Sequence, residues 1–225
     1  MSKAMLLSSA LGTVMALSFG GAALAQTSAS ATTDLNIRSG PGPQYPVTGV
    51  IEAGGEATVN GCLQGSKWCT VTTSGGEGWV YSDYLTADLS GSAVVLTERY
   101  ADVGVPVVTY EADDTTGGTA AGAAGGALAG AIVGGPVGAV VGGVAGAVAG
   151  GTADAIDEPN EEVRTYVTTN QVDPVYLEGE VVVGASLPET VELREIPDYE
   201  YRYVYVNGQP VLVEPSSRRI VYVVR

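Results

Sequence analysis

The sequence contains no histidine at all. Histidine is the commonest general base and the commonest metal ligand, so its absence excludes Ser-His and Cys-His nucleophile pairs. Neighbouring carboxylates could serve acid–base chemistry, but acidic runs are usually solvated, and nothing in the pattern gathers them in a pocket. The sequence therefore predicts a protein that is not an enzyme and that needs no cofactor and no metal. The neighbouring carboxylates are Asp113 with Asp114, Glu161 with Glu162, and Asp198 with Glu200.

Basic residues are scarce. Ten Lys and Arg stand against 25 Asp and Glu, which gives a net charge of −15. A surface of this charge repels nucleic acid and anionic lipid headgroups. Arg218 and Arg219 form the only adjacent basic pair, which is too small to bind a phosphate backbone. We expect no nucleic-acid partner.

There are only two cysteines, Cys62 and Cys69, which cannot close a four-ligand zinc site alone. In an oxidising compartment they are expected to form a disulfide, since a hairpin turning at Gly65 would bring the side chains opposite each other. The alternative is a pair of reduced thiols, one of them buried.

The first 25 residues have the three parts of a cleaved secretory signal. Lys3 supplies the positive charge, an apolar stretch runs from Ala4 to Phe19, and Ala23-Leu24-Ala25 has the small-x-small pattern of a cleavage site. The alternative is a membrane anchor, but the apolar stretch is short and the cleavage pattern follows directly. We therefore expect an exported protein, located in the periplasm or outer membrane, that begins at Gln26.

Four segments follow the signal, and they differ in composition. Residues 31–86 contain five short strand patterns separated by Gly and Pro turns, which predicts a small β-barrel. Residues 87–116 predict a largely extended connector, and residues 117–151 carry no charge and predict a Gly/Ala-rich helical hairpin. Residues 161–225, rich in Val and Tyr, predict a small C-terminal β module. The expected fold class is mainly β with one helical segment.

Residues 31–86 contain a series of motifs in a specific order. They are Leu35-Asn36-Ile37-Arg38-Ser39-Gly40-Pro41-Gly42, Tyr45-Pro46-Val47, Gly49, Gly54-Gly55 and Gly78-Trp79-Val80. This order resembles that of bacterial SH3-like domains, and Cys62 with Trp68-Cys69 resembles a variant found in exported alphaproteobacterial members. The resemblance implies an association with the cell wall, where such domains accompany peptidoglycan enzymes and bind glycan or peptide stems. The expected partner is therefore peptidoglycan or another envelope protein.

Four aromatic residues of this segment could line a binding groove. Trp79 and Tyr84 are expected in the core instead, because large aromatic side chains dominate the burial of a small domain. Tyr45 and Trp68 lie next to turns and polar residues, which makes them the better ligand-binding candidates. Arg38 is expected to bond the carbonyls of its own turn rather than a ligand.

Residues 117–151 contain a regular glycine pattern. Nine of their 14 glycines recur at every fourth position, which on a helix places them on one face and allows close helix packing. Pro136 divides the segment into two arms that are each short for a hydrocarbon core of about 30 Å, which leaves a helical hairpin in a thin bilayer or a single kinked span. The pattern resembles the glycine-zipper segments of bacterial envelope proteins and predicts membrane insertion or homo-oligomerisation; a surface-packed helical pair is the alternative. The nine glycines are Gly118, Gly122, Gly126, Gly130, Gly134, Gly138, Gly142, Gly146 and Gly150.

The C-terminal segment is expected to begin with a strand at Val163 to Thr168. Further on, Asn207-Gly208 is the strongest short hairpin signal, and it follows an alternating run of tyrosines. Period two places Tyr201, Tyr203 and Tyr205 on one face of the sheet. This face is either a binding surface or, as we expect, a surface covered by a neighbouring element.

The same segment resembles a C-terminal domain family of unknown function found in exported alphaproteobacterial proteins, and this resemblance implies no activity. The residues that carry it are Leu187-Pro188, Pro197, Tyr201-Arg202-Tyr203, Tyr205-Val206-Asn207-Gly208, Val211-Leu212-Val213 and Arg219-Ile220-Val221.

The leading hypothesis from the sequence is a non-catalytic envelope protein that binds the wall and associates with a membrane or with itself. The alternative hypothesis is a membrane-active oligomer or pore-like assembly built on residues 117–151.

Overall fold

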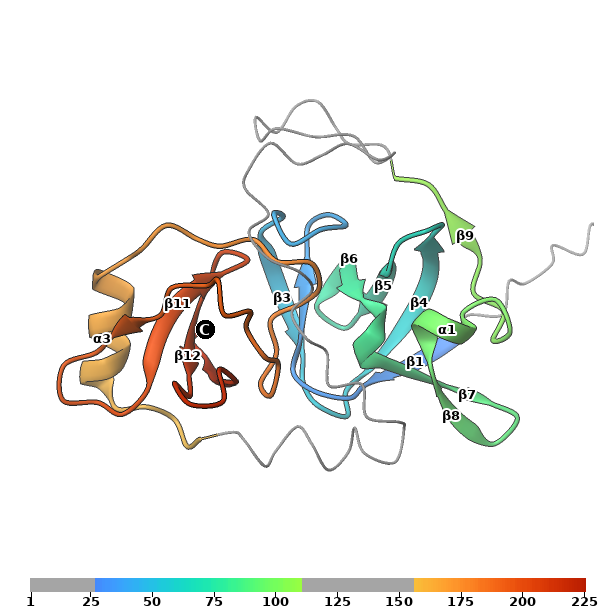
Figure 1. Cartoon of the computed structure of the whole chain (residues 1–225). Coiled ribbons are helices and arrows are strands. Elements are labelled where there is room, and N and C mark those ends of the chain that lie inside the picture. Colours follow the sequence, from blue (N-terminus) through green and yellow to red (C-terminus); the bar gives the residue numbers. More distant parts are fainter. Residues whose placement is uncertain (1–26, 111–155) are drawn as a thin grey trace, which may run out of the picture.

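The computed structural model describes residues 27–110, here called the N-terminal module, and residues 156–225, here called the C-terminal module (Figure 1). The predicted signal peptide, the Asp113–Asp114 pair and the glycine segment lie outside the described residues. They remain predictions from the sequence.

The N-terminal module is one bent, mostly antiparallel sheet. Its strands run in the order β3-β2-β6-β5-β4-β1-β7-β8, and the short β9 adds to β4 in parallel. The buried side chains from β1 to β7 gather in one apolar core, which Leu96 and Val105 complete. The elements are β1 (Thr27–Ala31), β2 (Leu35–Arg38), β3 (Val47–Ile51), β4 (Glu56–Leu63), β5 (Trp68–Thr73), β6 (Gly76–Tyr81), a 3₁₀ turn η1 (Ser82–Tyr84), β7 (Leu85–Leu89), β8 (Ser92–Val95), α1 (Leu96–Arg99) and β9 (Val107–Val108).

Residues 87–110 differ from the extended connector that the sequence predicted. They complete the hairpin β7–β8, form the short helix α1 and add β9 beside β4. The hairpin turns at Ser90 and Gly91, both with positive φ, and Leu96 of α1 is completely buried in the core. Residues 87–110 belong to the N-terminal module because their apolar side chains, among them Leu96 and Val105, pack in its core.

The C-terminal module is a four-stranded antiparallel sheet, β10-β11-β12-β13, with helix α3 on one face (Figure 1). Asn207 and Gly208 form the predicted hairpin turn between β11 and β12, with φ values of 52° and 80°. The elements are α3 (Glu161–Thr169), β10 (Arg194–Glu195), β11 (Arg202–Val206), β12 (Gln209–Val213) and β13 (Ile220–Val223).

The strand predicted at Val163 to Thr168 is wrong, because this segment lies within helix α3. The Asn160 side chain caps the helix by accepting a hydrogen bond from the Val163 amide at 2.9 Å. Glu161 and Glu162 lie in the first turn, where negative charge favours a helix. Val163 and Val167 alternate as in a strand, but they are also four residues apart, and both bury the same helix face.

The tyrosine face of β11 is covered by a neighbouring element, as expected. Tyr203 and Tyr205 donate their hydroxyl hydrogens to carbonyls of α3 and its C-terminal cap, those of Asn170 and Val167. The opposite face of β11 packs Val204 and Val206 into a second core. The tyrosines therefore hold the helix on the sheet.

Among the described residues, no helix is both long enough and apolar enough to cross a membrane.

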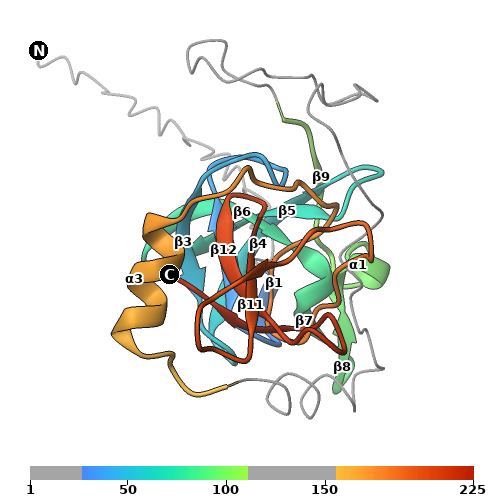
Figure 2. The ribbon, with the colours of Figure 1, turned by 60° about the vertical axis from the view of Figure 1, so that its left-hand side comes forward.

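The two modules lie against each other (Figures 1 and 2). Hydrogen bonds join β2 of the N-terminal module to Glu180 and to the β11–β12 turn of the C-terminal module, and Arg225 bonds the carbonyl of Asp34. Tyr84 packs against the cores of both modules.

Candidate functional site

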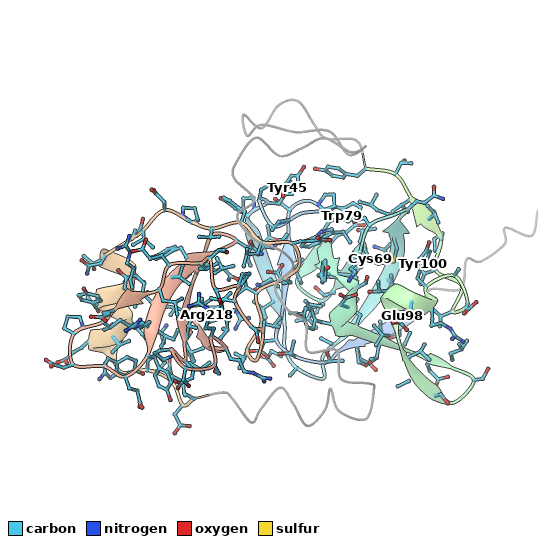
Figure 3. All side chains as sticks on the ribbon, viewed as in Figure 1. Tyr45, Cys69, Trp79, Glu98, Tyr100 and Arg218 are labelled. Atoms are coloured by element: carbon cyan, nitrogen blue, oxygen red, sulfur yellow. A yellow bond between two sulfur atoms is a disulfide. The ribbon has the colours of Figure 1, made fainter. Side chains whose placement is uncertain are left out.

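Tyr45 belongs to a group of three partly exposed aromatic residues, here called the aromatic trio, which also contains Trp79 and Tyr110. The Tyr110 ring lies edge-on to Tyr45 at 6.0 Å and edge-on to Trp79 at 5.4 Å between centroids. Figure 3 shows Tyr45 and Trp79 near each other on the N-terminal module. Three partly exposed rings at one place form a surface that can stack on a ligand.

The turn after β2 positions Tyr45. A Cβ added to Gly40 would lie 2.4 Å from Cδ1 of the Tyr45 ring, so this ring rests directly on the glycine backbone. Burial raises the pKa of Tyr45 to about 12, and the Tyr110 hydroxyl beside it contributes to the rise. Tyr45 therefore stays a neutral hydrogen-bonding side chain at ordinary pH.

Trp79 was expected in the core, but the structure leaves it half-buried outside the core cluster. The next side chain on β6, that of Val80, points inward and is completely buried because side chains alternate along a strand. Tyr84 is confirmed as a packing residue, and its burial raises its pKa, with a further contribution from the charge of Asp83.

Trp68 lies in a different aromatic group. Its side chain is only 6% exposed, and its ring lies edge-on to Tyr81 at 5.4 Å. The Tyr81 ring also packs 3.7 Å from the position of a Cβ on Gly179 of the C-terminal module. Tyr45 and Trp68, the two ligand-binding candidates, are therefore not brought together, and Trp68 offers little surface to a ligand.

The predicted disulfide between Cys62 and Cys69 is present. The two residues are directly paired across β4 and β5, with their Cα atoms 4.0 Å apart. Both side chains are buried in the core of the N-terminal module.

Arg38 bonds its own turn, as expected. Its Nη1 atom donates to the carbonyl of Tyr45 at 2.7 Å and to that of Pro43 at 3.0 Å. The same nitrogen also donates to the carbonyl of Asn207 in the C-terminal module at 3.3 Å. Arg38 is only 1% exposed, so its remaining donors need partners inside the protein.

Glu180 supplies these partners. In the sequence it is the second of two glutamates, Glu178 and Glu180, before an apolar run, and nothing there distinguishes it from Glu178. Arg38 donates through Nε to Glu180 Oε2 at 2.5 Å and through Nη2 to Oε1 at 2.6 Å, a bidentate ion pair. Glu180 Oε1 also accepts hydrogen bonds from Asn36 Nδ2 at 3.1 Å and from the Val181 amide at 2.8 Å. Asn36 Nδ2 donates to Gln209 Oε1 as well, at 2.7 Å.

Sequence reasoning also missed Tyr110 and Asn36. Tyr110 lies within residues 87–116, which the sequence predicts to be a connector. The Val107-Val108 run before it was the available signal of a strand. Asn36 alternates with Leu35 and Ile37, so its position on the outer face of β2 was readable from the period of two. Its partners were not readable, because they lie more than 140 residues away in the chain.

Comparison with known proteins agrees with this organisation. Residues 33–86 match the family described as "Bacterial SH3 domain", and residues 166–225 match "Domain of unknown function (DUF1236)". The chain is 36% identical over 78 residues to "Putative N-acetylmuramoyl-L-alanine amidase YrvJ" of Bacillus subtilis (strain 168), which is 35% of this chain. It spans only 15% of the length of that relative. The chain thus carries a bacterial SH3 domain followed by a C-terminal domain of unknown function.

Proposed function

We propose that this protein is a non-catalytic component of the cell envelope that binds peptidoglycan, or a partner attached to it, through the aromatic trio. The observation that carries the proposal is the position of three partly exposed aromatic rings on a bacterial SH3 domain. The similarity to a protein named "Putative N-acetylmuramoyl-L-alanine amidase YrvJ" supports the same class of ligand. The leader-like first 25 residues support export to the periplasm or outer membrane.

Aromatic side chains suit this ligand class. The faces of Tyr and Trp rings bury apolar area against a ligand, while the phenol and indole groups keep a polar edge for hydrogen bonds. Both Tyr45 and Trp79 are held in place by β2, β6 and the turn between β2 and β3, so little conformational entropy is lost when a ligand binds.

Replacing Trp79 or Tyr45 with alanine is expected to weaken binding to purified sacculi by about tenfold or more, which corresponds to about 1.4 kcal/mol. The reason is that buried aromatic anchors carry most of the energy of a recognition surface. Co-sedimentation of the full chain with sacculi over a range of concentrations measures the effect.

The matched control is Tyr201→Ala, which removes a partly exposed aromatic residue from the C-terminal module. It should sediment like the wild type. Equal losses in all three variants, or a wild-type protein that stays in the supernatant, would contradict the proposal.

The glycine segment supports a second part of the proposal, association with a membrane or with other copies of the chain. Deletion of residues 117–151 is expected to move the protein from the membrane fraction of its host to the soluble periplasmic fraction. Fractionation of cells that produce the full chain or the deletion variant measures this change of location. A second variant replaces the glycines that recur at every fourth position with leucine. A wild-type protein that is already fully soluble and monomeric would refute this part and leave the wall-binding part in place.

A further inference from the structure

The contact between the modules is built on a polar face of the bacterial SH3 domain. Leu35 and Ile37 of β2 point into the core, so Asn36 and Arg38 point to the other side of the strand. Both are nonetheless almost completely buried, with exposed fractions of 0% and 1%. They are covered by Glu180 and the β11–β12 turn of the other module.

This polar face has the donors of a carboxylate receptor. A guanidinium that offers two parallel N–H groups is the strongest and most specific partner of a carboxylate in proteins. Here Arg38 makes this bidentate contact with Glu180, and the amide of Asn36 adds a third donor. Two further bonds from Arg38 to the carbonyls of Pro43 and Tyr45 hold the guanidinium in its orientation.

Glu180 pairs with the donors of this polar face but leaves one of its acceptors without a partner. Within the described residues, Oδ1 of Asn36 is buried without a hydrogen-bond partner. A buried acceptor without a donor destabilises the docked arrangement, and a ligand with a suitably placed donor would satisfy it. The free end of a peptide carries both groups on one residue, a carboxylate and the amide N–H next to it. Its carboxylate would bind Arg38 and Asn36 Nδ2, and its N–H would donate to Asn36 Oδ1.

We infer that Asn36 and Arg38 form a binding site for the C-terminal carboxylate of a peptide, and that Glu180 occupies this site as an internal competitor. This site uses the amide of Asn36 and the guanidinium of Arg38, whereas the aromatic trio binds through its rings. The inference therefore stands or falls independently of wall binding through Tyr45 and Trp79.

The C-terminal module presents Glu180 in a fixed position. The Asn207 side chain accepts a hydrogen bond from the Leu177 amide at 2.8 Å and donates one to the Gly179 carbonyl at 3.1 Å. The hairpin turn thereby braces the segment that leads to Glu180. The Glu180 carboxylate therefore reaches Arg38 only when the whole C-terminal module docks, and it separates from Arg38 when the module undocks.

Around Arg38 and Glu180 the contact between the modules is polar, while Tyr84 adds apolar packing against both cores. Buried ion pairs contribute little net stability once the cost of desolvating both charges is counted. Polar contacts between domains are typical of surfaces that open and close. A peptide carboxylate therefore competes with a covalently tethered but weakly held internal ligand.

Glu180→Gln is the direct test, because it removes the competing charge and keeps the shape of the side chain. Calorimetric titration uses four probes: acetyl-Ala-Ala with a free carboxylate, in the L,L and D,D forms, and the C-terminal amides of both. We expect at least one free acid to bind Glu180→Gln at least tenfold more tightly than it binds the wild type, and neither amide to bind. Binding should disappear in Glu180→Gln combined with Arg38→Gln. The D,D form corresponds to the ends of wall peptides and the L,L form to protein C-termini, so the preferred probe identifies the source of the ligand.

Gln209→Ala is the second variant, for the case that Glu180→Gln does not fold, as judged by circular dichroism. It removes one contact between the modules, the bond from Asn36, and leaves Arg38 and Glu180 in place. We expect a gain of about threefold in affinity for the same free acid, equal to about 0.6 kcal/mol. The inference is overturned if the folded variants bind the free acids no better than the wild type does, or if the amides bind equally well.

Discussion

Arg38→Leu is expected to lower the free energy of unfolding by about 3–5 kcal/mol, the usual cost of removing one partner from a buried ion pair. The carboxylate of Glu180, with 0% exposure, would lose both bonds of the bidentate pair and remain buried. The turn that carries Tyr45 would also lose the two bonds that Nη1 donates to its carbonyls. Urea denaturation followed by tryptophan fluorescence measures the change.

Two controls separate the buried pair from a general effect of charge. Lys67→Ala removes an ion pair with Asp83 that is 46% exposed on the lysine side, and it should cost about 1 kcal/mol or less. Arg38→Leu combined with Glu180→Leu should recover part of the loss, since no charge is then left buried. If Arg38→Leu costs no more than Lys67→Ala, the pair does not couple the two modules.

Replacing both Cys62 and Cys69 with alanine is expected to lower the free energy of unfolding by about 2–3 kcal/mol, the value for a cross-link that closes a loop of this length. The two cysteines are seven positions apart and face each other across β4 and β5. The N-terminal module depends on this link because a core of its size is marginal by buried area alone. Thermal unfolding should shift downward by roughly 10–20 °C.

Reduction gives the matched control for this prediction. Dithiothreitol should lower the melting temperature of the wild type to that of the double variant and should leave the double variant unchanged. A wild-type protein whose melting temperature does not respond to complete reduction would show that the strands, rather than the disulfide, hold this module together.

Several features of the fold were readable from short stretches of sequence. The alternation of Leu35, Asn36, Ile37 and Arg38 predicted a strand with one buried face. The structure has strand β2 there, but both of its faces are buried. Asn207-Gly208 predicted a hairpin because both residues tolerate the positive φ that its turn requires. Each of these signals depends only on neighbouring residues.

Other features failed because a short pattern fits two structures. The segment from Val163 to Val167 matches the period of a strand and that of a helix. The Asn160 cap and the position of the segment against Tyr203 and Tyr205 decide for the helix. Trp79 has the size of a core residue, but its position in the alternation of β6 places its side chain outside the core. There it contacts Tyr110, whose segment has no strong secondary-structure signal in the sequence.

The sequence by itself determined the mainly β character of the chain and the bacterial SH3 domain, because both follow from local alternation, turn chemistry or ordered motifs. It predicted the pairing of Cys62 with Cys69 but left two reduced thiols as the alternative, and the structure decided for the disulfide. Only the tertiary structure decided what Asn36 and Arg38 contact. Glu180 lies 142 positions from Arg38 in the chain, and no periodicity links residues so far apart. They meet because two modules with separate apolar cores pack together, and a buried guanidinium is costly unless a carboxylate pairs with it.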